Sequence, residues 1–330
     1  MKRREFFTLV GAAGAAWPFA ARAQHSEKVR LVGVLLGWTE KDANAQKRLV
    51  ALRDGLAELG WIEGRNIQFA IRWSGGDVER THAFAAELVS LNPDVILTHG
   101  TAAIAAMKAA TTSIPTVFVV VNDPVAQGYV PNVGHPGGNI TGFSYMDYSM
   151  LGKALGLLKE IAPGVVRVGF IFNPDDYPYY EVYLRTLQAG RQTLGLDVIA
   201  MRVHSDAELE DALAKAVTEP GGSVYAAPST FLFAQRRKIV EGAAMRGLPA
   251  VYGSREPVEE GGLMSYAPDQ MDIFKRSVSY VDRILRGASP ADLPIQSPTK
   301  FEFVLNLKTA KKLGLSIPSG VLAIADEVIE

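Results

Sequence analysis

Residues 29–36 read VRLVGVLL, and nearly every side chain in this run is apolar. A strand buried on both faces of a parallel sheet has such a composition. Leucines then recur at helical spacing, at 49, 52, 56 and 59, and Gly60 ends the helix that this spacing predicts. The alternation continues with strands predicted at 67–73, 94–98 and 116–121 and helices predicted through 84–88 and over 102–110. This order predicts a parallel sheet with helices on both faces.

The same alternation of predicted strands and helices begins again in the second half of the chain. A helix is predicted over 151–161, and the run VRVGFIF at 166–172 repeats the character of the first strand. The pattern then predicts helices at 180–194, 207–217 and 235–246 and strands at 196–203, 223–227 and 249–252. Two successive units of similar length and order fit poorly into one sheet. We therefore predict an α/β protein of two doubly wound lobes, each with its own core.

Two glycine-rich segments mark the crossings between the predicted lobes: GGNITG at 137–142 and GGLMSY at 261–266. A long amphipathic helix at 271–287 and an alternating strand at 301–306 follow the second one. We predict an N-terminal lobe of residues 24–142 plus about 264–294, and a C-terminal lobe of 143–263 plus about 295–330. Crossing strands of this kind form a hinge, for which we name Gly142, Gly262 and Tyr266, with a cleft between the lobes.

The first 23 residues resemble an export signal rather than part of the fold. Lys2, Arg3 and Arg4 precede an apolar run at 6–20, and the small-x-small pattern at 21–23 suits cleavage before Gln24. The arginine pair followed by EFF favours a twin-arginine signal, with an ordinary secretory signal as the alternative. We therefore predict a signal peptide at 1–23 and a periplasmic mature protein.

Composition excludes several classes of function. The formal net charge is -1, with 48% hydrophobic and 21% charged residues, so nothing favours nucleic acid or a membrane surface as a partner. The chain has no cysteine, which rules out disulfides, thiol catalysis, cysteine-ligated metals and a lipid-anchored N-terminal cysteine. Beyond the leader no apolar run reaches membrane-spanning length. We expect a monomer that is not embedded in the membrane.

In open parallel sheets, ligands bind beyond the carboxyl ends of the strands, where helix N-termini present free N–H groups. Residues at such positions are frequently helix caps and nothing more. As a set, however, their loops converge on the predicted cleft. The ligand-binding residues we predict are Trp38, His99, Gly100, Thr101, Asn122 and Asp123 in the first lobe and Asn173, Tyr177, Ser229, Thr230 and Glu256 in the second.

Aromatic rings stand near two of these strand ends. Trp38 and the tyrosines at 177, 179 and 180 would place rings at the mouth of the cleft, where they stack on a planar ligand. Alternatively, the tyrosines cover a helix N-terminus and its neighbours.

Signals for catalysis and metal binding are absent from the sequence. The five histidines show no metal-binding spacing, and a lone histidine such as His99 is usually structural. The adjacent pairs Asp175-Asp176 and Glu259-Glu260 are expected to be solvated loop charges. Neither a nucleophile elbow nor a P-loop occurs. We predict no metal, no cofactor and no enzymatic activity.

Several separated motifs agree in order with one family. They are DPVA at 123–126, PGGNITG at 136–142, GGLMSY at 261–266, YVDRILRG at 280–287, PADLP at 290–294, PTKFEFVLNLKTA at 298–310 and LGLSIP at 313–318. With them, the whole chain resembles the ABC transporter substrate-binding proteins whose relatives include tryptophan- and tyrosine-type binding proteins. The resemblance implies a type I periplasmic-binding-protein fold, with two Rossmann-like lobes and three crossing segments closing on a small solute. The aromatic loop at 175–180 departs from the pattern expected for the family.

We therefore expect a periplasmic receptor that captures a small polar solute, an amino acid or related carboxylate, and delivers it to an ABC permease in the inner membrane. In the amino-acid version, groups near Thr101 and Asn122 hold the carboxylate, and Asp123 or Glu256 pairs with the ammonium. The alternatives are an exported ligand sensor on the same fold and an exported enzyme. The enzyme would need a cofactor fingerprint or a convergent acid/base set, and the sequence has neither.

Overall fold

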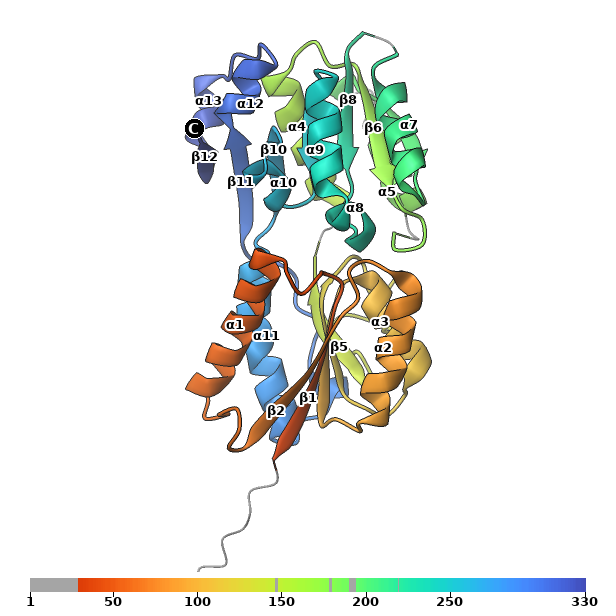
Figure 1. Ribbon diagram of the computed structural model, residues 1–330, viewed down its shortest axis with the longest axis vertical. Helices are drawn as coiled ribbons and strands as arrows, with labels where there is room; N and C mark the ends of the chain where they lie inside the picture. The colour runs from red at the N-terminus through yellow and green to blue at the C-terminus, as the bar shows by residue number, and fades with distance from the viewer. Residues whose placement is uncertain (1–28, 146–147, 178–179, 190–193, 219) are drawn as a thin grey trace, which may run out of the picture.

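Two separate sheets organise the chain in the computed structural model, which describes residues 29–330 apart from 146–147, 178–179, 190–193 and 219 (Figure 1). The predicted leader, residues 1–23, lies outside the described residues. The first described strand starts at the end of its lobe that is remote from the other lobe (Figure 1).

The first lobe holds a parallel five-stranded sheet in the order β2-β1-β3-β4-β5. Its strands are β1 (Arg30–Leu36), β2 (Ile67–Trp73), β3 (Val95–His99), β4 (Thr116–Val121) and β5 (Ile140–Ser144). Helices α1 (Ala43–Glu58) and α11 (Gln270–Leu285) pack together on one face, and α2 (Val78–Ser90) and α3 (Thr101–Ala110) pack on the other. β1, β3 and β4 are almost wholly buried, as their continuous apolar runs predict.

The second lobe holds a seven-stranded sheet in the order β12-β11-β10-β9-β8-β6-β7, in which only the β10–β11 pair is antiparallel. Its strands are β6 (Arg167–Phe172), β7 (Asp197–Arg202), β8 (Gly222–Ala226), β9 (Ala250–Tyr252), β10 (Met264–Pro268), β11 (Phe301–Asn306) and β12 (Glu327–Ile329). Its helices are α4 (Tyr148–Ile161), α5 (Tyr180–Ala189), α7 (Asp206–Ala216), α8 (Thr230–Ala234), α9 (Arg236–Met245), α10 (Glu256–Glu259), α12 (Leu307–Lys312) and α13 (Ser319–Ala323). The predicted α/β fold of two doubly wound lobes is confirmed.

Side chains of the loops begin many of these helices. Asp42, Asp77 and Asp269 cap α1, α2 and α11, and each accepts a hydrogen bond from the backbone N–H three residues ahead. Ser229 caps α8 in the same way. Such caps satisfy donors that a helix start leaves without an intrahelical acceptor, which is why polar residues follow the strand ends. Helix α3 differs, because its cap is Gly100, which has no side chain to offer.

The chain passes between the lobes at three places, after β5, after β10 and after the short 3₁₀ helix Pro290–Asp292. The crossings are tied to one another: Gln296 N–H donates to Gly142 O at 3.0 Å, and Asp269 N–H donates to Lys300 O at 3.0 Å. Residues 264–268, which we expected to open the returning part of the N-terminal lobe, form β10 in the second sheet. The chain crosses only after Pro268, because β10 is held by ladders to both β9 and β11.

Two of the predicted hinge residues are glycines that allow close packing. A Cβ at Gly142 would lie 2.1 Å from Phe118 O on the neighbouring strand, and one at Gly262 would lie 2.4 Å from the Tyr252 ring. Tyr266 lies in β10 with the Lys153 Nζ atom 4.5 Å from its ring centroid. Gly142 is the one of the three that bonds directly to another crossing segment.

Candidate functional site

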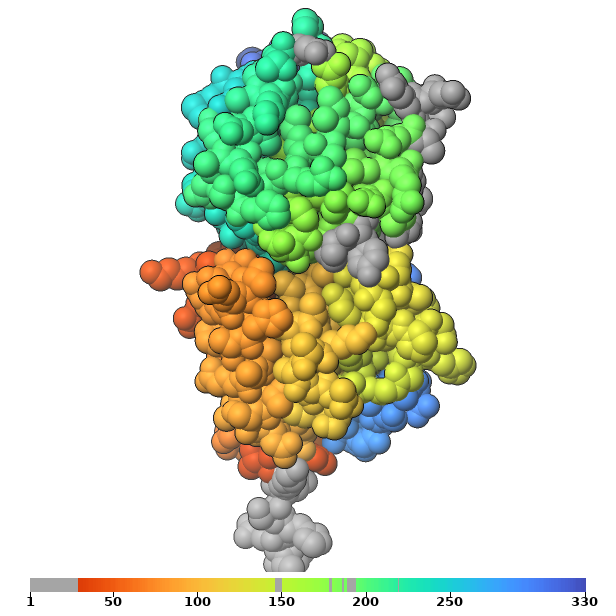
Figure 2. Space-filling model, turned by 90° about the vertical axis from the view of Figure 1, so that its right-hand side faces the viewer, coloured from red at the N-terminus to blue at the C-terminus, as the bar shows by residue number. Residues whose placement is uncertain are grey.

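A small cavity of about 50 Å³ lies between the lobes, where the carboxyl ends of strands from both sheets meet. On the face shown in Figure 2, the two lobes are in contact where they meet. Its walls come from β1, β3 and β4 and their following loops on one side, and from β8, α8, α9 and β9 on the other. We call it the central cavity; it is lined by Trp38, His99, Gly100, Thr101, Val120, Asp176, Ala226, Ala227, Pro228, Ser229, Thr230, Leu232, Phe233, Arg236, Ile239, Tyr252, Gly253, Ser254, Pro257 and Gln270.

The structure brings six of the predicted ligand-binding residues to this cavity: Trp38, His99, Gly100, Thr101, Ser229 and Thr230. Glu256 lies instead in the wall of a neighbouring cavity.

The other four predicted residues do not line the central cavity. Asp123 turns its carboxylate back onto its own loop, where it accepts from Ala126 N–H at 3.0 Å, and the preceding Asn122 is buried. Asn173 likewise accepts from Asp175 N–H at 2.8 Å. Tyr177 is buried in the core of the second lobe, 5.1 Å from the Tyr183 ring. Asp123, Asn173 and Tyr177 thus make loop or core contacts within their own lobes.

Of the predicted aromatic residues that the structure describes, Trp38 lines the central cavity. Its ring stacks on His99 at a centroid distance of 3.5 Å, and the Arg48 guanidinium lies 4.8 Å from its centroid. Tyr180 stacks on Phe172 at 4.2 Å, away from the central cavity. Tyr179 lies outside the described residues. Trp38 therefore contributes its ring to the cavity wall, stacked on a histidine.

His99 is held as a neutral ring. It is 4% exposed, and neither ring nitrogen has a hydrogen-bond partner among the described residues. Burial, assisted by the positive charge of Arg48, holds the pKa of His99 well below its usual range. A neutral imidazole carries one donor and one acceptor nitrogen, so this ring can recognise either kind of polar group.

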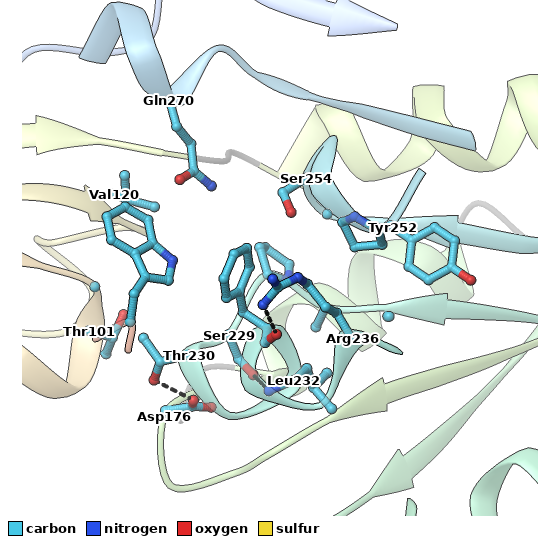
Figure 3. A pocket seen from close by; sticks show the side chains of 18 of the residues that line it. Thr101, Val120, Asp176, Ser229, Thr230, Leu232, Arg236, Tyr252, Ser254 and Gln270 are labelled. Atoms are coloured by element: carbon cyan, nitrogen blue, oxygen red, sulfur yellow. Dashed lines mark hydrogen bonds between the residues drawn. The ribbon is translucent and has the colours of Figure 1, made fainter. Parts of the chain in front are cut away.

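Asp176 is a buried carboxylate at the same cavity, which the sequence did not identify. It is 4% exposed, and its Oδ2 atom accepts from Thr230 Oγ1 at 2.9 Å and from Phe231 N–H at 2.8 Å (Figure 3). Oδ1 has no partner among the described residues. Burial raises the pKa of Asp176 to about 6, although its hydrogen bonds act to lower it. The expectation that Asp175-Asp176 are both solvated is wrong for Asp176, because the β6–α5 loop turns it inward under α8.

Thr230 of the second lobe fits into a notch made by glycines of the first. A Cβ at Gly37 would lie only 2.4 Å from Thr230 Cγ2, and one at Gly100 would lie 3.1 Å from it. A Cβ at Gly76 would lie 3.0 Å from Thr230 O. The lobes can approach this closely only because these three positions have no side chain.

Polar contacts across the cleft hold the lobes in this closed arrangement. Arg236 of α9 pairs with Asp42 of the first lobe at 2.8 Å and with Glu260 at 3.0 Å. Arg48 of α1 forms a buried ion pair with Glu256 of α10. Burial raises the pKa of Glu256, but the charge and hydrogen bond of Arg48 outweigh it, so that pKa lies below its ordinary value. The two pairs connect the start of α1 to the second lobe.

Sequence reasoning missed several residues of the site. Asp176, Arg236, Ser254 and Gln270 bring charged or polar groups to the cavity from four different loops or helix starts (Figure 3). Ser254 stands just beyond the end of β9. Arg236 and Gln270 lie in the first turns of α9 and α11, so only the folded contact between lobes reveals them.

Among the described residues, no group of three or more histidine, aspartate or glutamate side chains is placed to hold a metal ion. None of the helices in the described part of the chain is both long and apolar enough to cross a membrane.

An interlobe cavity with buried polar atoms is the architecture of a protein that closes on a solute. The family model of ABC transporter substrate binding proteins matches residues 36–329, so the chain belongs to that family of binding proteins, which are not enzymes. The resemblance found in the sequence is thereby confirmed.

Individual relatives agree with this assignment. The tyrosine-binding protein of Clostridioides difficile strain R20291 is 25% identical over 261 residues, which are 79% of this chain and 74% of that protein. A conserved domain protein from Vibrio cholerae is 27% identical with a TM-score of 0.84, over 91% of this chain and all of the other. An ABC domain in complex with L-Trp from Streptococcus pneumonia, at 24% identity, has a TM-score of 0.82 over 91% of this chain and 99% of that one. The type I periplasmic-binding-protein fold is confirmed.

Proposed function

We propose that this protein is the periplasmic solute-binding component of an ABC importer, and that its solute is an α-amino acid with an aromatic side chain. The solute binds between the lobes, which close around it less tightly than in the present arrangement, where the central cavity of about 50 Å³ is smaller than the solute. It is then passed to a permease in the inner membrane. The names of two relatives, one tyrosine-binding and one in complex with L-Trp, support the class of solute. Trp38, Phe233 and Tyr252 supply aromatic surface around the central cavity.

The observation that carries the proposal is the free oxygen of Asp176. A buried carboxylate with one unpartnered oxygen is costly, and a cation beside it removes the cost. The ammonium group of an amino acid offers both a positive charge and three N–H donors. This assigns to Asp176 the role that the sequence analysis gave to Asp123 or Glu256.

The carboxylate of the solute has a matching place on the other lobe. The first N–H groups of α3 have no side-chain cap, because the cap residue is Gly100, and Thr101 lines the cavity. Free N–H groups and the helix dipole both favour an anion there. A solute held by α3 on one side and by Asp176 on the other contacts both lobes, which is the condition for a ligand to stabilise closure.

Calorimetry with three related compounds tests this placement. L-Tyrosine carries both charged groups, tyramine lacks the carboxylate, and 3-(4-hydroxyphenyl)propionate lacks the ammonium. Asp176→Asn is expected to weaken binding of L-tyrosine and tyramine by about tenfold or more, since a charge-assisted hydrogen bond is lost, and to leave the propionate unaffected. Asp175→Asn is the matched control, because Asp175 is exposed and pairs with His204 at 3.1 Å. No heat with any amino acid, or equal affinity in Asp176→Asn, would overturn the proposal.

Export and transport are tested in cells. With Arg3→Lys and Arg4→Lys together, folded protein is expected to remain in the cytoplasm, because the twin-arginine route requires the pair. Normal export of this variant would return the leader to the ordinary secretory class. Deletion of the gene is expected to reduce uptake of the radiolabelled amino acid, and unchanged uptake would argue against the importer role.

A further inference from the structure

A second and larger cavity, of about 360 Å³, lies next to the hinge between α1, α10 and the β10–α11 crossing. We call it the hinge-side cavity. Its walls come from both lobes, and it shares Ser254 and Gln270 with the central cavity. Its volume falls within the range of small-molecule sites, whose lower end is about 300 Å³.

Arg48 and Glu256 both line this cavity, and each has buried side-chain atoms without a hydrogen-bond partner in the described part of the chain. Their side chains are 5% and 2% exposed, and they form the ion pair between the lobes. That pair uses only Arg48 Nη2 and Glu256 Oε1. Arg48 Nε and Nη1 and Glu256 Oε2 have no hydrogen-bond partner among the described residues. Each such buried group costs free energy until something pairs with it.

Gln270 adds one further acceptor. Its Nε2 atom donates to Tyr145 Oη at 3.2 Å, while Oε1 has no partner among the described residues. The neighbouring Arg255 differs, because it pairs with Glu259 at 2.8 Å and also with Glu302. The atoms without a partner therefore need a hydrogen-bond acceptor beside Arg48 and a hydrogen-bond donor beside Glu256 and Gln270.

We propose that the hinge-side cavity is a second binding site, specific for a small zwitterion of the amino-acid type. The carboxylate of the zwitterion accepts from Arg48, and its ammonium donates to Glu256 Oε2 and Gln270 Oε1. A simple anion leaves the two acceptors unpaired, and a simple cation leaves the guanidinium donors unpaired. The site is distinct from the one proposed for the transported solute at Asp176.

Occupancy of this site is coupled to closure. Arg48 belongs to the first lobe and Glu256 to the second, so the complete site exists only when the lobes are together. A ligand that binds only the closed form raises the population of that form. The zwitterion therefore promotes closure without competing for the central cavity.

Glycine, the smallest amino-acid zwitterion, is the probe. The chain has no cysteine, so spin labels at Val50→Cys and Met245→Cys, both exposed and one in each lobe, report the interlobe distance by pulsed electron resonance. Glycine at millimolar concentration is expected to raise the ratio of closed to open molecules about threefold or more. Acetate and methylammonium at the same concentration, which each carry half of the zwitterion, are expected to have no comparable effect.

Substitutions test whether glycine acts through the hinge-side cavity. Arg48→Met with Glu256→Gln removes both charges together and is expected to abolish the response to glycine. Gln270→Leu leaves the ion pair in place, tests the site if the double variant folds poorly, and is expected to reduce the response severalfold. Arg72→Met with Glu87→Gln, a pair near the surface with an Nε–Oε2 distance of 3.0 Å, is the matched control.

The outcomes separate this site from the central one. Asp176→Asn is expected to keep the response to glycine, whereas loss of the response in that variant would place glycine in the central cavity and overturn the inference. No response in the wild type, or an equal response to acetate or methylammonium, would also overturn it. Failure of aromatic amino acids to bind bears only on the proposed function.

Discussion

At the scale of single residues, the closed arrangement depends on the absence of a side chain at Gly37. Its φ lies outside the left-handed region, so alanine fits the backbone itself and the conflict arises only with Thr230 across the cleft. The sequence showed a glycine at a strand end and a threonine at a helix start. Nothing in the pattern revealed that the two positions meet.

Gly37→Ala is expected to disfavour the closed arrangement by about 1–3 kcal/mol, as overpacking usually does, while the free energy of unfolding changes little. The same pair of spin labels at positions 50 and 245 measures this change as a smaller fraction of molecules at the interlobe distance of the closed form. Thr230→Ser removes Cγ2 and keeps the hydroxyl bonded to Asp176, so it should restore part of the closed population in the double variant. A closed fraction equal to that of the wild type in Gly37→Ala would contradict the steric account.

Asp176 gives a prediction on pH dependence. Its pKa is raised to about 6 in the folded protein from an ordinary 3.8, so the folded state binds this proton more tightly than the unfolded state does. Protonation of Asp176 therefore stabilises the folded state by about 3 kcal/mol. This stabilisation is fully present below pH 3.8 and is lost as the pH rises through 6. The free energy of unfolding of wild type relative to Asp176→Asn should therefore fall between pH 4 and pH 7. Urea titrations that give parallel curves for the two proteins would contradict the prediction.

At the scale of elements, two helix caps of the same residue type have different roles. One stabilises its helix, and the other also joins the lobes. Asp42 and Asp77 both cap helices of the first lobe, through hydrogen bonds of 2.9 and 2.8 Å. The second carboxylate oxygen of Asp77 pairs with Arg80 on its own helix, whereas that of Asp42 pairs with Arg236 of the second lobe. The same residue type at the same helical position therefore does two different things.

Asp42→Ala and Asp77→Ala should each lower the free energy of unfolding by about 1 kcal/mol, the usual cost of losing a cap. Only Asp42→Ala should also reduce the closed population, because only Asp42 reaches across the cleft. Asp42→Asn keeps a capping oxygen and loses the charge, so it should affect closure more than unfolding. Urea unfolding and the interlobe distance measure the two effects, and equal closure in both alanine variants would argue against a role for Arg236 in holding the lobes.

The sequence predicted individual strands and helices better than it predicted contacts between them. The runs 29–36, 116–121 and 166–172 are apolar enough to be buried strands in any arrangement of the chain, and the leucines of α1 face one side by their spacing alone. The end of β10 was less predictable. Its residues resemble a hinge because glycines precede them, but ladders to β9 and β11 keep them in the second sheet until Pro268.

At the scale of the whole molecule, the two lobes have separate cores. Leu155, Phe170 and Val251 belong to one buried cluster in the second lobe, while Val34, Leu52 and Phe274 belong to another in the first. The three crossings and the cleft contacts connect them. Each lobe is therefore expected to behave as its own cooperative unit.

Scanning calorimetry should show two overlapping transitions without solute. A saturating solute that contacts both lobes should raise the lower transition and merge it with the upper, since it binds only the native pair. A single transition without solute, with equal calorimetric and van't Hoff enthalpies, would show that the lobes unfold together.

The sequence by itself determined the strands, most helices, the division into two lobes and the family, because apolar periodicity and local motifs depend on neighbours along the chain. Six of the residues that it singled out line the central cavity, since strand ends converge in any parallel sheet. Only the tertiary structure decided the burial of Asp176, the fit of Thr230 against Gly37 and the pairing of Arg48 with Glu256. Each of these is a contact between segments more than fifty residues apart, and its energy depends on packing and burial that no local pattern records.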